Sequence, residues 1–337
     1  MRVVLATEGP RLPADRALEI PCGGVEIATA MLVRALAQAG HAVRVLAGDG
    51  PPETDADGAI WASKADGAAD LVIANRAPKL FAMLPRGRRV LWLHNPARYL
   101  RKPRHAWPLL WARPRIVVLG PSHRATLPGF FARDAVEIPL AVSPPFDAGA
   151  PLRPPPAPKA VFASNPLRNL DALLAIWAAR ILPAVPGATL HVFAGAGVYG
   201  GDARLAGRAG PVLERAAHTP GVVLRGPQPR PELAQNYGRA RTMLYLGDPG
   251  ETFCLAVAEA QAMGLPCVLG DEGAVAERVR DGVTGIVAAD HGRFAEAAIH
   301  VLRDDAAWSA MHHAALEGPR PPDWAEVARR FIALAAS

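Results

Sequence analysis

The sequence predicts an α/β protein made of two doubly wound, parallel-sheet domains. Its 337 residues exceed the length that one hydrophobic core of about 150 residues normally serves. Strand-like runs alternate with helix-like runs, and the strands are continuously apolar, as is typical of strands buried on both faces of a parallel sheet. A proline-rich stretch at 142–159 interrupts this alternation. It therefore separates two halves of the same class.

The domain boundaries follow from that interruption. We expect a first Rossmann-like domain over 1–147, a linker over 148–158 and a second Rossmann-like domain over 159–320. The amphipathic pattern of the last segment, 321–337, predicts a helix that packs back on the first domain. Two such domains are expected to face one another across a cleft, because sheets of this class bind ligands beyond the carboxyl ends of their strands.

The first domain opens with a strand over 2–7 and a helix that begins at Gly23 and Gly24 and ends at Gly40, with apolar residues at helical spacing. Further strands are predicted at 41–47, 70–75, 88–94, 115–120 and 136–142.

In the second domain, strands are predicted at 159–164, 188–195, 221–226, 241–247, 266–270 and 284–288, and helices at 169–183, 231–240, 252–263 and 274–282. Thr252 is the expected N-cap of the helix at 252–263.

Composition excludes several classes of protein. Half of the residues are hydrophobic, which excludes a largely disordered chain. The three cysteines, Cys22, Cys254 and Cys267, form no CxxC pair, so neither a disulfide framework nor a zinc site is indicated. The apolar run at the N-terminus is too short for a signal peptide or a membrane span. A cytoplasmic location is the expectation.

The net charge of +6 belongs to the first half of the chain. Between Asp70 and Asp134 there are 13 basic residues and no acidic one, which predicts a positive face on the first domain. The stretch 98–115 places cations between Tyr99, Trp107 and Trp111, a composition that suits an anionic membrane surface or a charged acceptor. Its prolines should prevent one long helix, and a solvated loop with two buried tryptophans is the alternative. No nucleic-acid recognition motif accompanies the charge.

Two glutamates stand in the apolar stretch 249–268. Glu251 follows a Pro-Gly corner, and Glu259 lies inside the helix expected there, where a carboxylate needs a hydrogen-bond partner. Backbone N–H groups at the start of that helix would bind an anion such as a diphosphate, and Glu259 would accept the hydroxyls of a ribose. The alternative is that Glu259 is a salt-bridged helix residue and Glu251 a solvated acid on a loop.

The same stretch resembles a family signature. ETFCLAVAEAQAMGLPCV is similar to the E-x7-E motif of family 4 glycosyltransferases, also called glycosyl transferases group 1, which have the GT-B fold. The flanking segments GPQPRPELAQNYGRARTMLYLG and GAVAERVRDGVTGIV resemble that family as well, and GGVEIATAMLVRALAQAGHAVRVLA resembles its first Gly-Gly loop and helix. The resemblance therefore covers nearly the whole chain, more loosely in the first domain.

The resemblance implies a retaining, metal-independent transfer of a sugar from a UDP- or GDP-sugar to a glycan, a lipid-linked or a lipopolysaccharide-type acceptor. It implies no cofactor other than the donor substrate. The catalytic residues that it implies are His94, Arg168 and Glu251; the donor-binding residues are Gly23, Gly24, Ser164, Arg168, Gln228, Phe253, Cys254, Leu255 and Glu259.

The chain departs from the family at several of these positions. Thr252 and Cys254 stand where the family usually has glycine, so their side chains would restrict the sugar pocket. The family commonly places an Arg and a Lys near 164–171, whereas this chain offers Arg168 alone, with Ser164 near the expected arginine. Arg168 would then meet the charge of the leaving diphosphate nearly alone. The alternative for Arg168 is an ordinary surface residue at a helix start.

Residues of the first domain are expected at the carboxyl ends of its strands. His94 ends an apolar strand, and Gly23 and Gly24 would let the backbone approach a phosphate closely. The alternative for His94 is a satisfied core histidine.

Two rival functions remain from sequence. One is a GT-B sugar-nucleotide epimerase or phosphorylase; a phosphorylase of this fold needs a lysine-bound pyridoxal phosphate, and none of Lys64, Lys79, Lys102 and Lys159 lies near the donor motif. The other rival is a non-catalytic nucleotide-sugar-binding protein. The expected location is cytoplasmic, with a possible peripheral contact on the inner face of the membrane.

Overall fold

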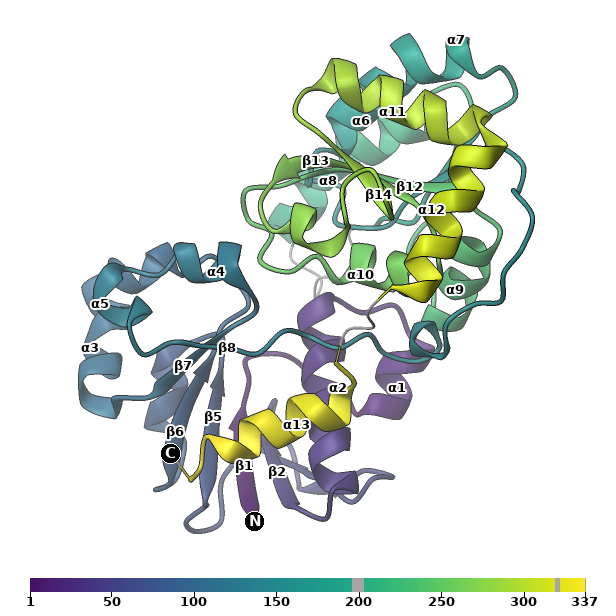
Figure 1. Ribbon diagram of the computed structural model, residues 1–337. Coiled ribbons are helices and arrows are strands. Elements are labelled where there is room, and N and C mark those ends of the chain that lie inside the picture. Colours follow the sequence, from purple (N-terminus) through teal and green to yellow (C-terminus); the bar gives the residue numbers. More distant parts are fainter. Residues whose placement is uncertain (196–202, 319–321, 337) are drawn as a thin grey trace. The chain divides into compact units, whose positions relative to one another are not determined.

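The structure is a computed structural model that describes residues 1–195, 203–318 and 322–336 (Figure 1). The chain divides into two compact units. Unit 1 comprises Met1–Ala17, Gly24–Ala141 and Pro321–Ser337, and unit 2 comprises Leu18–Gly23 and Val142–Arg320. The division falls after Ala141, at the start of the proline-rich stretch.

Unit 1 is built on an eight-stranded sheet with the order β3-β4-β2-β1-β5-β6-β7-β8. All neighbouring strands are parallel except β3 and β4, which form an antiparallel edge. The strands are β1 (Arg2–Ala6), β2 (Ala42–Leu46), β3 (Glu53–Thr54), β4 (Ile60–Ala62), β5 (Leu71–Asn75), β6 (Arg88–Trp92), β7 (Arg115–Val118) and β8 (Val136–Glu137).

The helices of unit 1 pack on this sheet (Figure 1). They are α1 (Ala14–Glu19, whose end passes into unit 2), α2 (Gly24–Gln38), α3 (Pro103–Ala112), α4 (Pro121–Ala125), α5 (Gly129–Ala132) and α13 (Trp324–Ala333), with 3-10 turns η1 (Pro78–Ala82), η2 (Ala97–Arg101) and η3 (Phe146–Ala148), the last in unit 2. The C-terminal helix α13 packs against α2. Its Phe331 ring also lies 5.2 Å from the ring of Trp92, which anchors the helix over the sheet.

Unit 2 carries a six-stranded parallel sheet with the order β11-β10-β9-β12-β13-β14. The strands are β9 (Lys159–Phe162), β10 (Thr189–Val192), β11 (Val222–Leu224), β12 (Thr242–Gly247), β13 (Cys267–Glu272) and β14 (Gly285–Ala288). The helices are α6 (Leu170–Ile176), η4 (Trp177–Ile181, a π-helical turn), α7 (Leu182–Ala184), α8 (Ala203–His218), α9 (Arg230–Gly238), α10 (Leu255–Ala262), η6 (Val275–Arg278), α11 (His291–Arg303) and α12 (Asp305–Glu317). The predicted fold class, two doubly wound parallel-sheet domains, is confirmed.

Each sheet has a point where the strand order reverses, and ligands of open α/β sheets bind outside the carboxyl ends of the strands at such a point. In unit 1 the reversal lies between β1 and β5, and in unit 2 it lies between β9 and β12. The loops after those four strands are therefore the positions where the fold presents side chains to a ligand.

Several local predictions were wrong. Residues 274–282 do not form a helix, because only the 3-10 turn η6 occurs there, and the strand predicted at 136–142 is limited to Val136–Glu137. Helices α8, α11 and α12 were missed. The first of them contains Gly207, Gly210 and Pro211, which hide a helical pattern, whereas the apolar spacing of Phe294, Ala298 and Val301 would have indicated α11.

Candidate functional site at the strand reversal of unit 2

The loop after β9 brings Arg168 to the reversal point. Asn165 starts a tight turn in which its side chain accepts from the Leu167 N–H at 2.9 Å and its carbonyl accepts from the Arg168 N–H at 2.9 Å. Asn169 then adopts a left-handed conformation with φ 57° before α6 begins. Its amide donates to the Gly247 carbonyl at 2.8 Å, which ties this loop to the end of β12. Arg168 is thus held beside the next loop.

The loop after β12 places Glu251 against Arg168. Asp248 forms the Pro-Gly corner by accepting from the Gly250 N–H at 2.7 Å and, through its carbonyl, from the Glu251 N–H at 2.8 Å. The Glu251 side chain is only 6% exposed, and its Oε1 forms an ion pair with the guanidinium of Arg168. The alternative of a solvated loop acid is therefore wrong for Glu251. Arg168 remains partly exposed at 36% of its side chain, so it can reach a ligand.

Tyr245 completes this cluster from inside β12. Its hydroxyl donates to Glu251 Oε1 at 2.8 Å, and the Ser164 hydroxyl lies 3.4 Å from the same tyrosine oxygen. Burial raises the pKa of Tyr245 well above its usual value, so the phenol stays protonated and keeps donating. Among the described residues, no partner occupies the second carboxylate oxygen of Glu251. The carboxylate is therefore fixed through one oxygen and keeps the other for a ligand.

Gly273 supports the same corner from the neighbouring strand. A Cβ at this position would lie 2.4 Å from the Asp248 carbonyl oxygen and 2.9 Å from Glu251 Cβ, and the backbone has φ +73°. Only glycine permits this approach. Sequence reasoning missed Gly273 and Tyr245. A hydroxyl inside a buried strand next to the motif was the available signal for Tyr245.

The start of α10 differs from the prediction. The helix begins at Leu255 and its N-cap is Cys254, so the expected N-cap Thr252 is wrong. Cys254 takes a left-handed conformation with φ 63°, which glycine would adopt without strain. The free N–H groups at the helix start consequently begin with that of Leu255. Phe253 is buried, and the guanidinium of Arg278 lies 4.1 Å from its ring centroid.

Glu259 lies inside α10 and is 3% exposed. Its Oε1 forms an ion pair with Arg230, so the alternative of a salt-bridged helix residue describes its state in this structure. Burial raises the pKa of Glu259, and the charge and hydrogen bond of Arg230 oppose that effect. Arg230 is held in turn by the Phe146 ring, 4.9 Å from its guanidinium carbon, and by a 3.4 Å hydrogen bond to the Pro144 carbonyl. Sequence gave no signal for Arg230.

The remaining predicted residues belong to other elements of the two units. Gln228 is half-buried and accepts from Asn236 at 3.1 Å. Gly24 begins α2 in unit 1, and Gly23 ends the short segment that groups with unit 2. His94 follows β6 in unit 1 and is 6% exposed, with its ring 4.3 Å from that of Trp92. The pKa of His94 is lowered, first by burial and then by the charges of Arg76 and His123, so the ring is neutral near pH 7.

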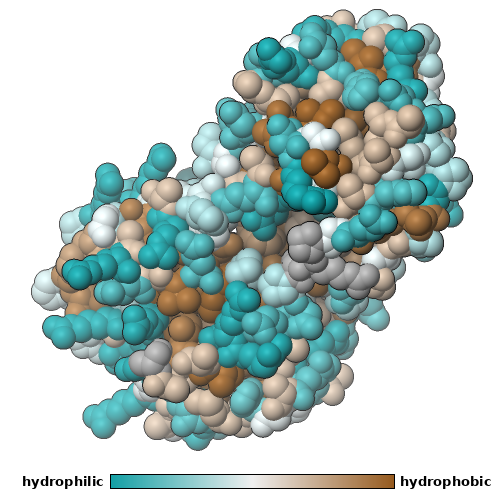
Figure 2. Space-filling view, in the orientation of Figure 1, coloured by the Kyte–Doolittle hydropathy of each residue, from teal (hydrophilic) through white to brown (hydrophobic). Residues whose placement is uncertain are grey.

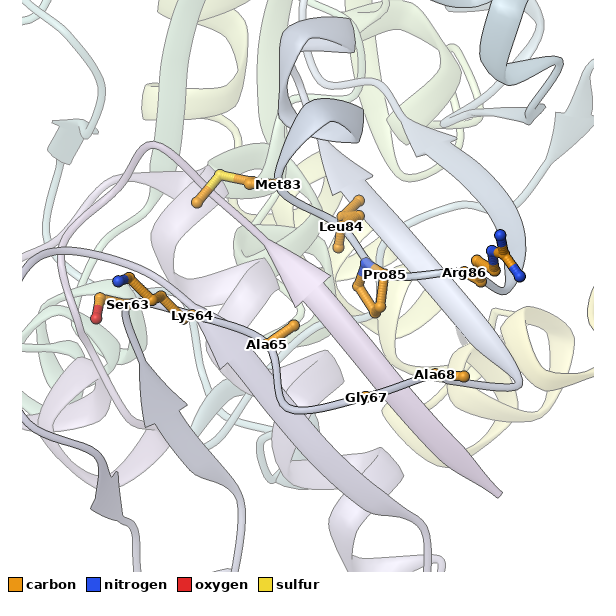
Figure 3. A pocket seen from close by; sticks show the side chains of 9 residues that line it. All are labelled: Ser63, Lys64, Ala65, Gly67, Ala68, Met83, Leu84, Pro85 and Arg86. Atoms are coloured by element: carbon orange, nitrogen blue, oxygen red, sulfur yellow. The ribbon is translucent and has the colours of Figure 1, made fainter.

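A pocket of about 460 Å³ lies elsewhere in unit 1, between the loop after β4 and the loop before β6 (Figure 3). Lys64 and Arg86 stand at opposite ends of the row of lining residues in that view. None of the predicted site residues lines it. The strand reversal of unit 2 is therefore the better candidate for the site.

Comparison with known proteins identifies the family that the second half of the chain resembles. The model of the family described as "Glycosyl transferases group 1" matches residues 158–304. A "D-inositol 3-phosphate glycosyltransferase 1" of Catenulispora acidiphila is 36% identical over 115 residues, which are 34% of this chain and 27% of that protein. The chain therefore matches about a quarter of that relative's length.

Solved structures resemble the whole chain. A sucrose-phosphate synthase from Thermosynechococcus elongatus has a TM-score of 0.70 at 16% identity and covers 99% of this chain and 96% of its own. The Anabaena protein Alr3699/HepE, solved in complex with UDP-glucose, has a TM-score of 0.69 at 14% identity and covers 100% and 99%. These likenesses show the GT-B fold. Residues 158–304 match the model of the group 1 glycosyltransferase family, which confirms the predicted resemblance.

Proposed function

We propose that the protein is a retaining glycosyltransferase that moves a sugar from a nucleotide diphosphate sugar, with UDP or GDP as the nucleotide, to a glycan, lipid-linked or lipopolysaccharide-type acceptor. The observation that carries the proposal is the Arg168–Glu251 pair at the strand reversal of a sheet whose sequence matches the model of this family. The epimerase, the phosphorylase and the non-catalytic binder are the rival functions.

The described residues fit the steps of such a transfer. The N–H groups at the start of α10 and the guanidinium of Arg168 would receive the diphosphate, and the free oxygen of Glu251 would accept a hydroxyl of the transferred sugar. When the glycosidic bond breaks, negative charge builds on the departing nucleoside diphosphate. Donors that are already oriented toward that charge lower the barrier, which is the part that Arg168 would play.

We assign the ribose to Glu259 and the sugar-side contact of unit 1 to His94, with Gly23 and Gly24 near the phosphates. Arg230 already occupies one oxygen of Glu259, so a ribose would bind the other oxygen or share the arginine. Transfer would proceed without a metal, because Arg168 and the helix start supply the positive charge. Turnover that survives excess EDTA is the expected result, and loss of turnover that Mg²⁺ restores would contradict this step.

Donor binding tests the proposal directly. Thermal unfolding of the full chain is followed with UDP, GDP and their sugars, and a ligand at 100 times its Kd should stabilise the protein by about 2.7 kcal/mol. A stabilising nucleotide sugar that is consumed in the presence of acceptors supports transfer. Binding without transfer or hydrolysis across a broad acceptor panel would favour the non-catalytic rival. No response to any nucleoside diphosphate would overturn the proposal.

Helix α3 of unit 1 supports a second proposal, that the protein contacts an anionic membrane. Trp107, Leu110 and Trp111 are 75%, 52% and 61% exposed, and their spacing places them on one side of the helix. The alternative of two buried tryptophans is therefore wrong. The expectation that prolines prevent one long helix over 98–115 is confirmed, because η2 ends at Arg101 and α3 runs only from Pro103 to Ala112, although Pro108 lies inside it.

Charge and exposure around α3 fit such a membrane contact. Arg101, Lys102 and Arg104 are exposed at its start, and Phe130 on α5 is 78% exposed. Figure 2 shows hydrophilic residues interspersed with groups of hydrophobic ones on the visible face. Exposed aromatic side chains beside cations are typical of surfaces that bind a membrane. No helix in the described ranges is long and apolar enough to cross a bilayer. We propose peripheral docking at the cytoplasmic face of the membrane.

Flotation with liposomes tests the docking step. The full chain should float with vesicles that contain phosphatidylglycerol and remain behind with pure phosphatidylcholine. Trp107→Ala with Trp111→Ala should lower the bound fraction several-fold, whereas Leu152→Ala, which removes an apolar side chain 58% exposed in unit 2, should leave it unchanged. Equal binding to both lipids would remove this step and leave the transferase proposal intact.

A further inference from the structure

Arg76 stands at the strand reversal of unit 1 in a conformation that costs free energy. It directly follows β5 and has φ 70°, in the left-handed region that a side chain of this size rarely adopts. Such a conformation costs about 1–2 kcal/mol and persists only where the surroundings impose it. Here the Arg76 N–H donates to the Trp92 carbonyl at 2.8 Å, and the Arg76 carbonyl accepts from the Tyr99 hydroxyl at 2.6 Å. The fold therefore holds this residue in place from both sides.

The guanidinium of Arg76 has no hydrogen bond or ion pair in the described part of the chain. The residue is half-buried, so its charge has lost part of its water without gaining a carboxylate. Glu8, which follows β1 at the same reversal, is already paired with Lys79 at 2.6 Å. Between Asp70 and Asp134 the sequence supplies no other acid. An oriented and unpaired arginine of this kind is suited to bind an oxyanion from solution.

The groups around Arg76 are neutral or polar. Burial raises the pKa of Tyr99 to about 12, although the nearby charge of Arg76 opposes that rise. The Tyr99 hydroxyl therefore stays protonated. Both ring nitrogens of His123 are engaged by the backbone, because Nδ1 accepts from the Leu119 N–H at 3.2 Å while Nε2 donates to the Asn95 carbonyl at 2.9 Å. His94 is neutral near pH 7, so the charged side chains at this edge are Arg76 and the Glu8–Lys79 pair, whose two charges compensate each other.

A second observation points to a ligand at the same place. Asn75 is fully buried at the end of β5, and its Nδ2 donates to the Thr29 hydroxyl at 2.8 Å. Its Oδ1 has no partner within the described residues. A buried amide oxygen without a donor costs about 1–3 kcal/mol, and most buried polar atoms of folded proteins have a partner. The Oδ1 atom of Asn75, the residue before Arg76, thus lacks a hydrogen-bond donor. A hydroxyl of a ligand or a water bound with it would supply that donor.

We infer that the strand reversal of unit 1 is an oxyanion site in which Arg76 binds a phosphate or carboxylate group of the acceptor. That the ligand is an acceptor rests on the proposed transferase function. That an oxyanion site exists rests on the residues of unit 1 alone. Arg76 would pair with two oxygens of the anion, and His94 would contact the same ligand from the neighbouring strand, because Asn75 and Trp92 are register partners in β5 and β6. The site thereby selects acceptors that carry a negative charge near the hydroxyl that receives the sugar.

The test follows residues of unit 1 by NMR while inorganic phosphate is added to the full chain. Phosphate should shift the guanidinium signal of Arg76 and the ring signals of His94. Phosphate that binds in unit 2 instead would shift signals of residues around Arg168 and the start of α10, so the two sites are distinguished. Acetate is the second probe. A response to phosphate alone identifies a phosphate site, and a response to acetate as well identifies a site for either oxyanion.

Three variants make the test specific. Arg76→Gly removes the cation but accepts φ 70° without strain, so the loop should keep its shape; the affinity for phosphate should fall about tenfold or more. Arg76→Lys should retain weaker binding. Arg88→Gln removes the same charge from an exposed position at the opposite end of β6 and should bind phosphate as the unmodified protein does.

Two outcomes would overturn the inference. One is the absence of any shift at His94 and Arg76 with either anion. The other is an equal response of His94 in the protein and in Arg76→Gly, which would show that the anion binds elsewhere. Neither outcome bears on donor binding in unit 2, which thermal unfolding with nucleotide sugars measures separately.

Discussion

The two strand reversals of the molecule hold their arginines in different ways. At the reversal of unit 2, Arg168 pairs with Glu251, and nearby Arg230 pairs with Glu259. At the reversal of unit 1, Arg76 has no acidic partner in the described ranges. The same sheet topology therefore presents paired charges in one unit and an unpaired cation in the other.

The difference in charge pairing indicates which properties of a ligand favour binding at each site. A ligand of unit 2 must compete with an internal ion pair or bind the oxygens that the pair leaves free, so geometry rather than net charge decides which molecule binds. A ligand of unit 1 meets an unpaired positive charge, so an anion gains affinity without displacing a protein group. A donor with a diphosphate and a sugar suits the first case, and a charged acceptor suits the second.

The largest expected effect is on the buried pair of unit 2. Arg230→Ala leaves the carboxylate of Glu259, whose side chain is 4% exposed, without its partner, and we expect a loss of about 3–5 kcal/mol in the free energy of unfolding. Denaturant unfolding monitored by circular dichroism measures it. A loss below about 1 kcal/mol would mean that the pair is solvated and that the contrast between the two units is weaker than the structure implies.

A double variant separates stability from binding. Arg230→Met with Glu259→Leu replaces the pair by apolar groups, which is often neutral for stability, so most of the loss should be recovered. Affinity for a nucleotide sugar should nevertheless remain low, because the ribose has lost its carboxylate. Recovery of stability together with full donor affinity would contradict the role proposed for Glu259.

The next effect concerns the pair that remains partly exposed. Arg168→Ala should lower kcat by about 10²–10³, because one oriented donor to a developing anion contributes roughly 3–4 kcal/mol. Steady-state kinetics with saturating donor measures this. Arg215→Ala breaks a 2.5 Å pair with Asp171 that is exposed on the same unit, and it should leave kcat unchanged. A variant of Arg168 that retains more than half of the turnover would refute the role.

Sequence predicted the elements that carry strong local patterns. The apolar runs indicated the strands of unit 2 and those of unit 1 except the edge strands β3 and β4, and the spacing of Glu251 and Glu259 indicated the candidate site in unit 2. The register of neighbouring strands then brings Ser164, Arg168 and Glu251 together, because the loops after β9 and β12 meet at the reversal. Once the order of the strands in the sheet is known, the apolar pattern of the sequence is enough to predict that these two loops meet.

The rest depended on contacts that no spacing reveals. Arg230 lies 29 positions before Glu259, and only the tertiary fold that brings the first residue of α9 to the side chain of Glu259 makes them partners. The shift of the N-cap from Thr252 to Cys254 depends on a backbone conformation that favours glycine and occurs here at a cysteine. Arg76 was counted as one of many basic residues, since its left-handed conformation and its missing partner exist only in the folded chain. These are tertiary effects that override local preference.

The smallest expected effect is the pH dependence that Glu259 adds to unit 2. Because burial raises the pKa of Glu259 above 4.5 in the folded protein, the folded state binds this proton more tightly than the unfolded state. Its contribution to stability is full below pH 4.5 and is lost as the pH rises through the folded pKa, by about 1.4 kcal/mol for each unit of the shift. Unfolding of the protein and of Glu259→Gln is compared between about pH 4 and 7. The difference in free energy of unfolding, protein minus variant, should fall as the pH rises, whereas Glu232→Gln, at an exposed position on α9, should show no such trend. A difference that rises with pH would mean that the charge of Arg230 outweighs burial, and the pair would then favour the ionised carboxylate outright.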